Sequence, residues 1–373
     1  FETKFLEKVA HLSQNVTLTP QILLNSQKYL AQTNWFKSVN EAKFYTQDSI
    51  FITEFNTISR SPLFFDGLIG LKQEDQNTTF AGEFQIKFEN IDRKGKSVGF
   101  TWQKPNSNSE KFELEFLYPL IFNSFINTKL FITKQTNLQF LHSWQVQQWF
   151  TYPFDFYHKV GVSIALNEGF VNDSTALIKY PEAQFEQKSV GFLYAYQSLN
   201  RLTNPQNGSA SHLSVDYVYQ RSNLETQHGF RFQNYFHYYL PVVNLNQIAL
   251  FGASLFAESK AIAKPQTKIK FEKEYQVETL NKDLADFQMN LFFEYRFLMD
   301  DYSRIGLFGQ FQYKQVNERE IKETIWGINV NLPIGEQNIS IEYLTRADLG
   351  LRKGLIQIGF SKQIDATVFY LQR

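Results

Sequence analysis

Cysteine is absent from this chain of 373 residues. Its absence excludes a disulfide scaffold and a thiolate metal site, and it fits an oxidising compartment such as the periplasm. Neither sign of charge is in excess, because 37 Lys and Arg residues balance 37 Asp and Glu residues. A nucleic-acid-binding protein would carry an excess of Lys and Arg, so we expect no nucleic-acid partner. No apolar run reaches the roughly 18 residues of a transmembrane helix, so the sequence predicts none.

Motifs for catalysis or metal binding are also missing. The segment 90–97, NIDRKGKS, ends like a phosphate-binding loop, but Asn90 stands where the first glycine is needed and no helix pattern follows. This segment predicts a hairpin turn instead. No G-x-S-x-G elbow occurs, and the six His residues show no metal-ligand spacing. We therefore predict no catalytic residue, no metal and no cofactor, and a protein that is not an enzyme.

Aromatic residues, by contrast, are abundant. The chain has 38 Phe, 19 Tyr and 5 Trp residues, yet its mean hydropathy is only -0.34. This combination would be unusual for a soluble core. It is typical of a transmembrane β-barrel, in which polar residues of the lumen dilute the residues that face lipid.

Residues 285–298 alternate between two faces. The odd positions are all apolar and read Ala285, Phe287, Met289, Leu291, Phe293, Tyr295 and Phe297. The even positions carry charge and amide groups and read Asp286, Gln288, Asn290, Phe292, Glu294, Arg296 and Leu298. Alternation with a period of two indicates a strand with one face toward lipid and the other toward a polar interior.

The same alternation recurs along most of the chain, in runs at 80–89, 111–118, 190–196, 213–219, 326–331, 339–343 and 356–360. Between 63 and 361 we count roughly 16 units, each with room for a strand of about 9–11 residues and a connection. A soluble all-β protein would have strands of about 5–6 residues and a polar outward face. Residues 61–373 therefore predict an all-β transmembrane barrel of about 16 antiparallel strands, with 259–284 as a long loop.

Residues 1–60 follow a different pattern, that of a small α+β module. Apolar residues at helical spacing predict a first helix and are Phe5, Leu6, Val9 and Ala10. Thr19 followed by Pro20 predicts the N-cap and first position of a second helix. The segment 35–55 then reads as two strands joined by a polar turn near Gln47–Asp48.

Together these regions resemble the BamA/TamA superfamily of outer-membrane proteins, which includes two-partner secretion transporters. Residues 1–57 look like the last POTRA domain of that family, without its first strand, so we expect the natural chain to extend upstream. The stretches that resemble its barrel are 64–102 (opening hairpin), 110–120 (EKFELEFLYPL), 290–314 (strands twelve and thirteen) and 327–344 (the next two). The resemblance implies a bacterial outer-membrane location, with the N-terminal domain in the periplasm. It also implies the lipid bilayer, client or partner outer-membrane proteins, and periplasmic chaperone or lipoprotein subunits as partners.

Family members carry an Arg-Gly-Phe signature on the loop before strand twelve, and its Arg pairs in the lumen with an Asp on strand thirteen. The matching positions are altered here: the resemblance places Glu278, Thr279 and Leu280 at the loop signature and Gln310 at the Asp. Parity along the strands directs Gln310 inward, together with Glu294 and Arg296 of strand twelve. The cation and its carboxylate partner thus look lost together, which avoids two like charges in a confined lumen.

The activity that the resemblance implies comes from opening a seam between the first and last strands, expected here at 63–72 and 353–361. Glycines in both strands fit a seam that frays easily and are Gly67, Gly70, Gly354 and Gly359. They could equally serve only to relieve crowding in the wall. The last strand is either GLIQIGFSK, followed by a tail, or DATVFYLQ.

Three functions remain open from the sequence. The first is assembly or export of outer-membrane or secreted proteins through the seam and the POTRA edge, which the POTRA-like region favours. The second is a degenerate, non-inserting family member that serves as a structural or accessory subunit of an outer-membrane complex, which the altered signature favours. The third is a passive channel, if the lumen is open.

Overall fold

A computed structural model gives the architecture of the chain. It describes residues 2–12, 18–33, 35–47, 50–74, 77–106, 109–137, 141–155, 157–172, 174, 184–199, 205–222, 226–259, 287–299, 303–316, 319–334, 337–347 and 355–364. The elements of the N-terminal module are α1 (Thr3–Val9), α2 (Pro20–Gln32), β1 (Phe36–Val39), β2 (Lys43–Gln47), β3 (Ile50–Glu54) and β4 (Thr57–Ser59).

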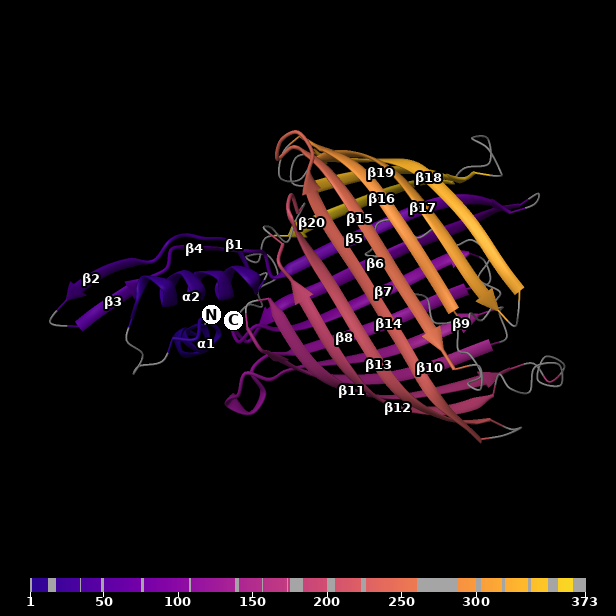
Figure 1. The fold of residues 1–373 in the computed structure, drawn as a ribbon, viewed down its shortest axis with the longest axis horizontal. Helices are drawn as coiled ribbons and strands as arrows, with labels where there is room; N and C mark the ends of the chain where they lie inside the picture. The colour runs from indigo at the N-terminus through magenta and orange to yellow at the C-terminus, as the bar shows by residue number, and fades with distance from the viewer. Residues whose placement is uncertain are drawn as a thin grey trace.

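The remaining strands are β5 (Leu63–Glu74), β6 (Asn77–Ile91), β7 (Lys96–Asn106), β8 (Ser109–Tyr118), β9 (Asn127–Asn137), β10 (Leu141–Pro153), β11 (His158–Val171), β12 (Phe185–Gln197), β13 (Gly208–Ser222), β14 (Thr226–Pro241), β15 (Gln247–Glu258), β16 (Phe287–Leu298), β17 (Arg304–Val316), β18 (Arg319–Ile334), β19 (Gln337–Arg346) and β20 (Leu355–Ile364), with a short 3-10 turn at Ile121–Asn123. These strands, β5 to β20, form one closed barrel in which each pairs with its chain neighbours and β20 pairs with β5 (Figure 1). The predicted barrel of about 16 antiparallel strands is confirmed.

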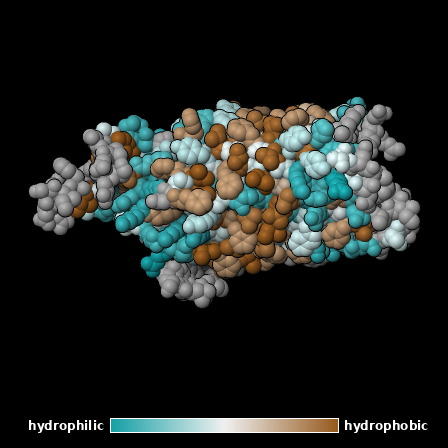
Figure 2. Space-filling model, turned by 90° about the horizontal axis from the view of Figure 1, so that it is seen from below, coloured by the Kyte–Doolittle hydropathy of each residue, from teal (hydrophilic) through white to brown (hydrophobic). Residues whose placement is uncertain are grey.

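Side chains alternate along the barrel strands between a lipid face and a lumen face. On β16 the outward Leu291, Phe293 and Phe297 are 44–46% exposed, whereas the inward Asn290 and Glu294 are 1% and 0% exposed. Figure 2 shows the result on one face of the barrel: apolar residues gather across its middle, with hydrophilic residues on both sides of them. Lipid tails solvate such a belt favourably, while closure of the sheet leaves no strand edge inside the bilayer.

The last strand is β20, so the first of the two alternatives for it is correct. Residues 365–373, which include the DATVFYLQ segment, lie outside the described part of the chain. The predicted long loop at 259–284 also lies outside it, except for residue 259. No described helix is both long and apolar enough to cross a membrane.

The N-terminal module has the predicted order of helices and strands. Thr19 caps α2, because its hydroxyl accepts a hydrogen bond from the backbone N–H of Ile22 at 3.2 Å, and Pro20 occupies the first turn. The predicted pair of strands forms as a hairpin in two sections, β2 with β3 and β1 with β4. Between the two sections the strands still bond at Asn40, whose N–H donates to Asn56 O at 2.9 Å, and within β1 the register shifts between Phe36 and Ser38.

The module contacts the turns at one mouth of the barrel. The backbone N–H of Glu2 donates to the carbonyl of Arg93 at 3.2 Å, in the β6–β7 turn. The Trp35 indole lies directly over Gly95, which has a φ of +69°. The His11 ring stacks on Phe125 of the β8–β9 connection at 4.5 Å between ring centroids. These contacts place the β6–β7 and β8–β9 turns on the same side of the membrane as the module.

Candidate functional site

The lumen wall at β16–β18 holds a buried ion pair. Arg296 Nε donates to Glu294 Oε2 at 2.7 Å, and the two side chains are 3% and 0% exposed. Both belong to β16 and point inward because they are two residues apart on one strand. The Glu294 carboxylate also accepts a hydrogen bond from Asn329 Nδ2 of β18 at 2.9 Å. It reaches across Gly306 of β17, where any side chain would collide with it.

The Arg296 guanidinium is further stabilised by an aromatic ring. Its Cζ atom lies 5.6 Å from the ring centroid of Tyr239 on β14, a cation–π geometry. Paired and hydrogen-bonded in this way, the two charges can stay in a lumen wall from which water is excluded. Sequence parity predicted that Glu294 and Arg296 face the lumen, and the structure shows that they pair with each other.

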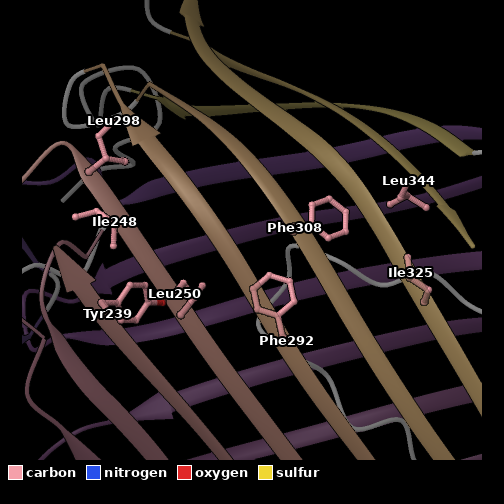
Figure 3. Packing of buried hydrophobic residues seen from close by; sticks show 8 residues of the cluster. All are labelled: Tyr239, Ile248, Leu250, Phe292, Leu298, Phe308, Ile325 and Leu344. Atoms are coloured by element: carbon pink, nitrogen blue, oxygen red, sulfur yellow. The ribbon is translucent and has the colours of Figure 1, made fainter. Parts of the chain in front are cut away.

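An apolar cluster lines the lumen beside this ion pair, within an interior that the sequence predicts to be polar. Its members come from β14 to β19 and are Tyr239, Ile248, Leu250, Phe292, Leu298, Phe308, Ile325 and Leu344, with Leu199 packed against it (Figure 3). All eight are at most 5% exposed. Phe292 and Leu298 occupy inward positions in the sequence pattern, so the apolar character of these two residues was the signal that could have predicted an apolar cluster in the lumen. The apolar side chains pack against one another, and this part of the barrel is dry.

A second polar network lies on the lumen face of β12 to β15 and was not predicted. Arg231 donates to Glu258 Oε1 from Nη2 at 2.7 Å, and to Gln187 Oε1 at 3.2 Å. Gln187 in turn donates to Gln220 at 3.0 Å. A charged residue at an inward position within an alternating strand, as Arg231 is in HGFRFQN, was the signal that could have identified it.

The signature positions are only partly described. Glu278, Thr279 and Leu280 lie outside the described residues, so the altered loop signature stays a prediction. Gln310 lies in the lumen face of β17 and is 8% exposed, as parity predicted. Its side-chain oxygen is buried and accepts no hydrogen bond from any described residue. At the position where the resemblance places the family's Asp, the Gln310 side-chain oxygen therefore has no hydrogen-bond donor among the described residues.

The seam is formed by β5 and β20, which pair from Leu63↔Ile364 to Leu71↔Ile356. Gly67 lies opposite Phe360, Gly70 opposite Gln357, and Gly359 opposite Leu68. Gly354 lies outside the described residues. The structure thus brings three of the four predicted seam glycines into one ladder, with Gly67 on one face and Gly70 and Gly359 on the other.

An aromatic stack joins the module to the barrel mouth. The His11 ring lies between Tyr29, at 4.0 Å, and Phe125, at 4.5 Å between centroids. Burial lowers the pKa of His11, because a charged imidazolium would lose hydration there. Burial also raises the pKa of Tyr29, and the Asp155 carboxylate adds to that effect. The neutral forms of both side chains therefore favour the stack.

No group of three or more His, Cys, Asp or Glu side chains suited to a metal ion occurs among the described residues. The interactions at the sites described above are buried ion pairs, apolar packing and strand pairing.

Comparison with known proteins supports the fold and goes no further. No protein-family model and no curated protein matches the sequence. Among solved structures, BamA from Haemophilus ducreyi lacking POTRA domains 1–3 matches 96% of this chain and 81% of its own, with a TM-score of 0.59 and 12% identity. CdiB from Acinetobacter baumannii matches 97% of this chain and 72% of its own, with a TM-score of 0.65 and 10% identity. CdiB from Escherichia coli matches 96% and 74%, with a TM-score of 0.57 and 8% identity.

Proposed function

We propose that this barrel, whose fold is similar to those of BamA and CdiB, assists the assembly or export of outer-membrane or secreted proteins by adding a client strand at its seam. The observation that carries this proposal is the composition of the β5–β20 ladder. Three of its nine residue pairs contain glycine, whereas only two of the fourteen pairs of the β13–β14 ladder do. A glycine contributes no side chain to a cross-strand pair, and each such pair is worth roughly 0.2–1 kcal/mol.

The last strand is also weakly held on its other side, since β19 and β20 pair over only eight residues. Opening the seam would therefore release β20 at a lower free energy than most strands of the barrel. An opened strand exposes a row of backbone N–H and C=O groups, which can pair with an extended segment of another chain. This is the physical route by which a client strand would bind.

We further propose that residues 1–60 are a POTRA-like domain in the periplasm and that 61–373 are the barrel. The structures of BamA and CdiB match 96% and 97% of this chain. The unmatched part is smaller than the module, so each match includes most of residues 1–60. Within the module, β2 and β3 pair only with each other among the described strands. Their outer edges are available to clients or to periplasmic chaperone or lipoprotein subunits.

The alternative is a non-inserting member that serves as a structural subunit of an outer-membrane complex. Gln310 favours it, because its buried oxygen has no donor among the described residues. The loop signature of the family would need a carboxylate at that position. The Glu294–Arg296 pair, fixed within one strand, instead gives this barrel a buried cation that belongs to the wall.

A disulfide lock across the seam tests the first function. Because the chain has no Cys, the pair Ile69→Cys and Ile358→Cys, directly opposite in the β5–β20 ladder, can be crosslinked alone. The matched control is Val215→Cys with Phe232→Cys, directly opposite in the β13–β14 ladder. We expect the oxidised seam variant to lose the assembly of client barrels and to regain it on reduction, while the control stays active.

Normal client assembly by the oxidised seam variant would refute the seam as the working site. A depletion experiment then separates the two functions. Loss of many folded outer-membrane barrels after depletion supports assembly. If other barrels are unchanged while one specific complex falls apart, the structural-subunit alternative is correct.

A further inference from the structure

The β6–β7 turn concentrates positive charge at the mouth of the barrel where the N-terminal module docks. Arg93 and Lys94 lie between the two strands, and Lys96 opens β7. In the sequence, the six other strand connections at this mouth together contain one Lys or Arg, which is Arg201. Their acidic residues are Asp155, Asp300, Asp301 and Glu336. A cluster of basic residues is therefore confined to one corner of this mouth.

The backbone of this turn holds the basic residues in place. Asp92 and Arg93 have left-handed φ values of +63° and +62°, a conformation that is unfavourable for a long side chain such as Arg. The Asp92 carboxylate fixes the turn: Oδ1 accepts a hydrogen bond from the Lys94 backbone N–H at 3.2 Å, and Oδ2 lies 2.7 Å from Lys96 Nζ. Arg93 is thus presented to solvent by a turn that its own neighbours hold in shape.

The acids near the turn do not neutralise it. Asp92 pairs with Lys96, and Glu2 of the module lies 3.5 Å from Lys94 with both side chains about half exposed. Water and salt screen such an exposed pair, so it holds Lys94 only weakly. Residues 92–96 contain three basic residues and one acid, so their net charge is +2, or +1 when Glu2 is included.

Next to this turn, the outer surface of β6, β7 and β8 is apolar. These strands lie side by side in the wall of the barrel (Figure 1). The strand register places Phe88, Val98 and Phe116 in one row across them. Phe88 and Phe116 are 45% and 38% exposed, and on β8 the exposed apolar side chains alternate with acids that face the lumen. This row therefore belongs to the surface that lipid tails contact.

A basic residue lies at the boundary between this apolar surface and water. Lys96 Nζ is 4.3 Å from the ring centroid of Tyr118, which is 46% exposed. Toward the module, the outer surface thus changes from apolar side chains to a Tyr ring with a Lys over it, and then to the exposed Arg93 and Lys94. A phospholipid presents its acyl chains, its interfacial region and its phosphate in the same order, and Tyr is enriched at that interfacial level.

From this arrangement we infer that the β6–β7 corner binds an anionic phospholipid of the leaflet on the module's side of the membrane. The headgroup phosphate binds Arg93 and Lys94, and the acyl chains pack against Phe88 and Phe116. Each basic residue near the membrane surface strengthens such binding by roughly fivefold, whereas the acids of the other turns repel the same headgroup. Since Trp35 and the Glu2 N–H contact this turn, the lipid and the docked module share it. The site does not require the seam to open.

Native mass spectrometry of the purified full chain in detergent tests the site, with phosphatidylglycerol and phosphatidylcholine of the same acyl chains as probes. We expect the native chain to bind phosphatidylglycerol at least about tenfold more tightly than phosphatidylcholine. Arg93→Gln with Lys94→Gln removes both charges and should abolish that preference. The matched control is Lys188→Gln with Lys322→Gln at the opposite mouth. It also removes two basic residues, 56% and 61% exposed and each paired with a Glu, and should keep the preference.

Asp92→Asn is a second variant, with the opposite expected effect. Asn keeps the oxygen that accepts the Lys94 N–H and tolerates the left-handed backbone, while the negative charge is lost. We expect phosphatidylglycerol to bind roughly fivefold more tightly to this variant, and phosphatidylcholine to bind as it does to the native chain. Heat-dependent mobility on gels verifies that every variant is folded before lipid is added.

The inference fails if the Arg93 and Lys94 double variant keeps the native preference, if the control loses it as well, or if Asp92→Asn does not strengthen binding. Inorganic phosphate at the same concentration as the lipid is the last probe. We expect it to leave the lipid bound, and displacement of the lipid by phosphate would overturn the assignment to a phospholipid. None of these measurements involves client assembly, so failure here is distinguishable from failure of the proposed function.

Discussion

Gly95 offers a decisive test of how the N-terminal module is fixed to the barrel. Its φ of +69° lies in the left-handed region, and a Cβ there would approach Trp35 Cη2 at 2.7 Å and Cε2 at 2.9 Å. Gly95→Ala must therefore either strain the turn or displace the indole. Gly99 of β7 is the matched control, since a Cβ on Gly99 would meet its nearest neighbours at an ordinary 3.7 Å.

The size of the effect follows from two terms. A non-glycine residue in the left-handed conformation costs roughly 1–2 kcal/mol, and loss of an aromatic contact such as Phe5–Trp35, at 5.2 Å between centroids, adds about 0.5–1.5 kcal/mol. The ion pair between Glu2 and Lys94 contributes little, because it spans 3.5 Å with both side chains about half exposed. A change of about 1.5–3.5 kcal/mol would lower the docked-to-undocked ratio by a factor of roughly 10–300, since about 1.4 kcal/mol corresponds to a factor of ten.

Spin labels at two introduced cysteines, one on α2 and one on the β10–β11 turn, would report the distance between module and barrel. We expect one narrow distance distribution for the native chain and for Gly99→Ala, and a broad one for Gly95→Ala. The folded barrel, followed by its heat-dependent mobility on gels, should be the same in all three. Indistinguishable distributions for the two alanine variants would refute the docking role of the Trp35–Gly95 contact.

Two further predictions follow from the described ion pairs and the aromatic stack. Arg296→Met leaves the buried Glu294 carboxylate without its cation and should destabilise the barrel by about 3–5 kcal/mol, which would lower the melting temperature measured on heated gels. The control is Lys322→Met, which removes an exposed ion pair of 3.0 Å and should change the melting temperature little. Equal effects of the two variants would contradict the argument. The lowered pKa of His11 means that the undocked state binds the proton more readily, so docking should weaken as the pH falls below about 6.5. The spin-label distances would show this broadening, and His11→Phe should remove it; a variant that keeps the same pH dependence would assign it to another group.

The local order of residues was enough to predict the barrel. Alternation along residues 285–298 determines which side chains face lipid, because successive side chains of a strand point to opposite faces. The N-cap at Thr19 is equally local, since it depends on one hydroxyl and the next turn of backbone. The same parity predicted the inward orientation of Glu294, Arg296 and Gln310, which are 0%, 2% and 8% exposed in the structure.

The partners of those inward residues could not be predicted in the same way. Arg231 and Glu258 are far apart in the sequence but lie opposite each other on neighbouring strands. Their alignment depends on the register of the β14–β15 hairpin, which a shift of one residue would change. The apolar cluster of the lumen also combines side chains from separate strands, so no single segment reveals it.

By itself, then, the sequence determined the period of two, the approximate number of strands, the aromatic outer face and the helix–hairpin module, because each depends on neighbours along the chain. Only the tertiary structure decided which strand closes the barrel, which charges pair, and which side of the lumen carries the apolar cluster. Closing a sheet on itself brings distant strands into one interior, and burial there depends on what the opposite wall presents.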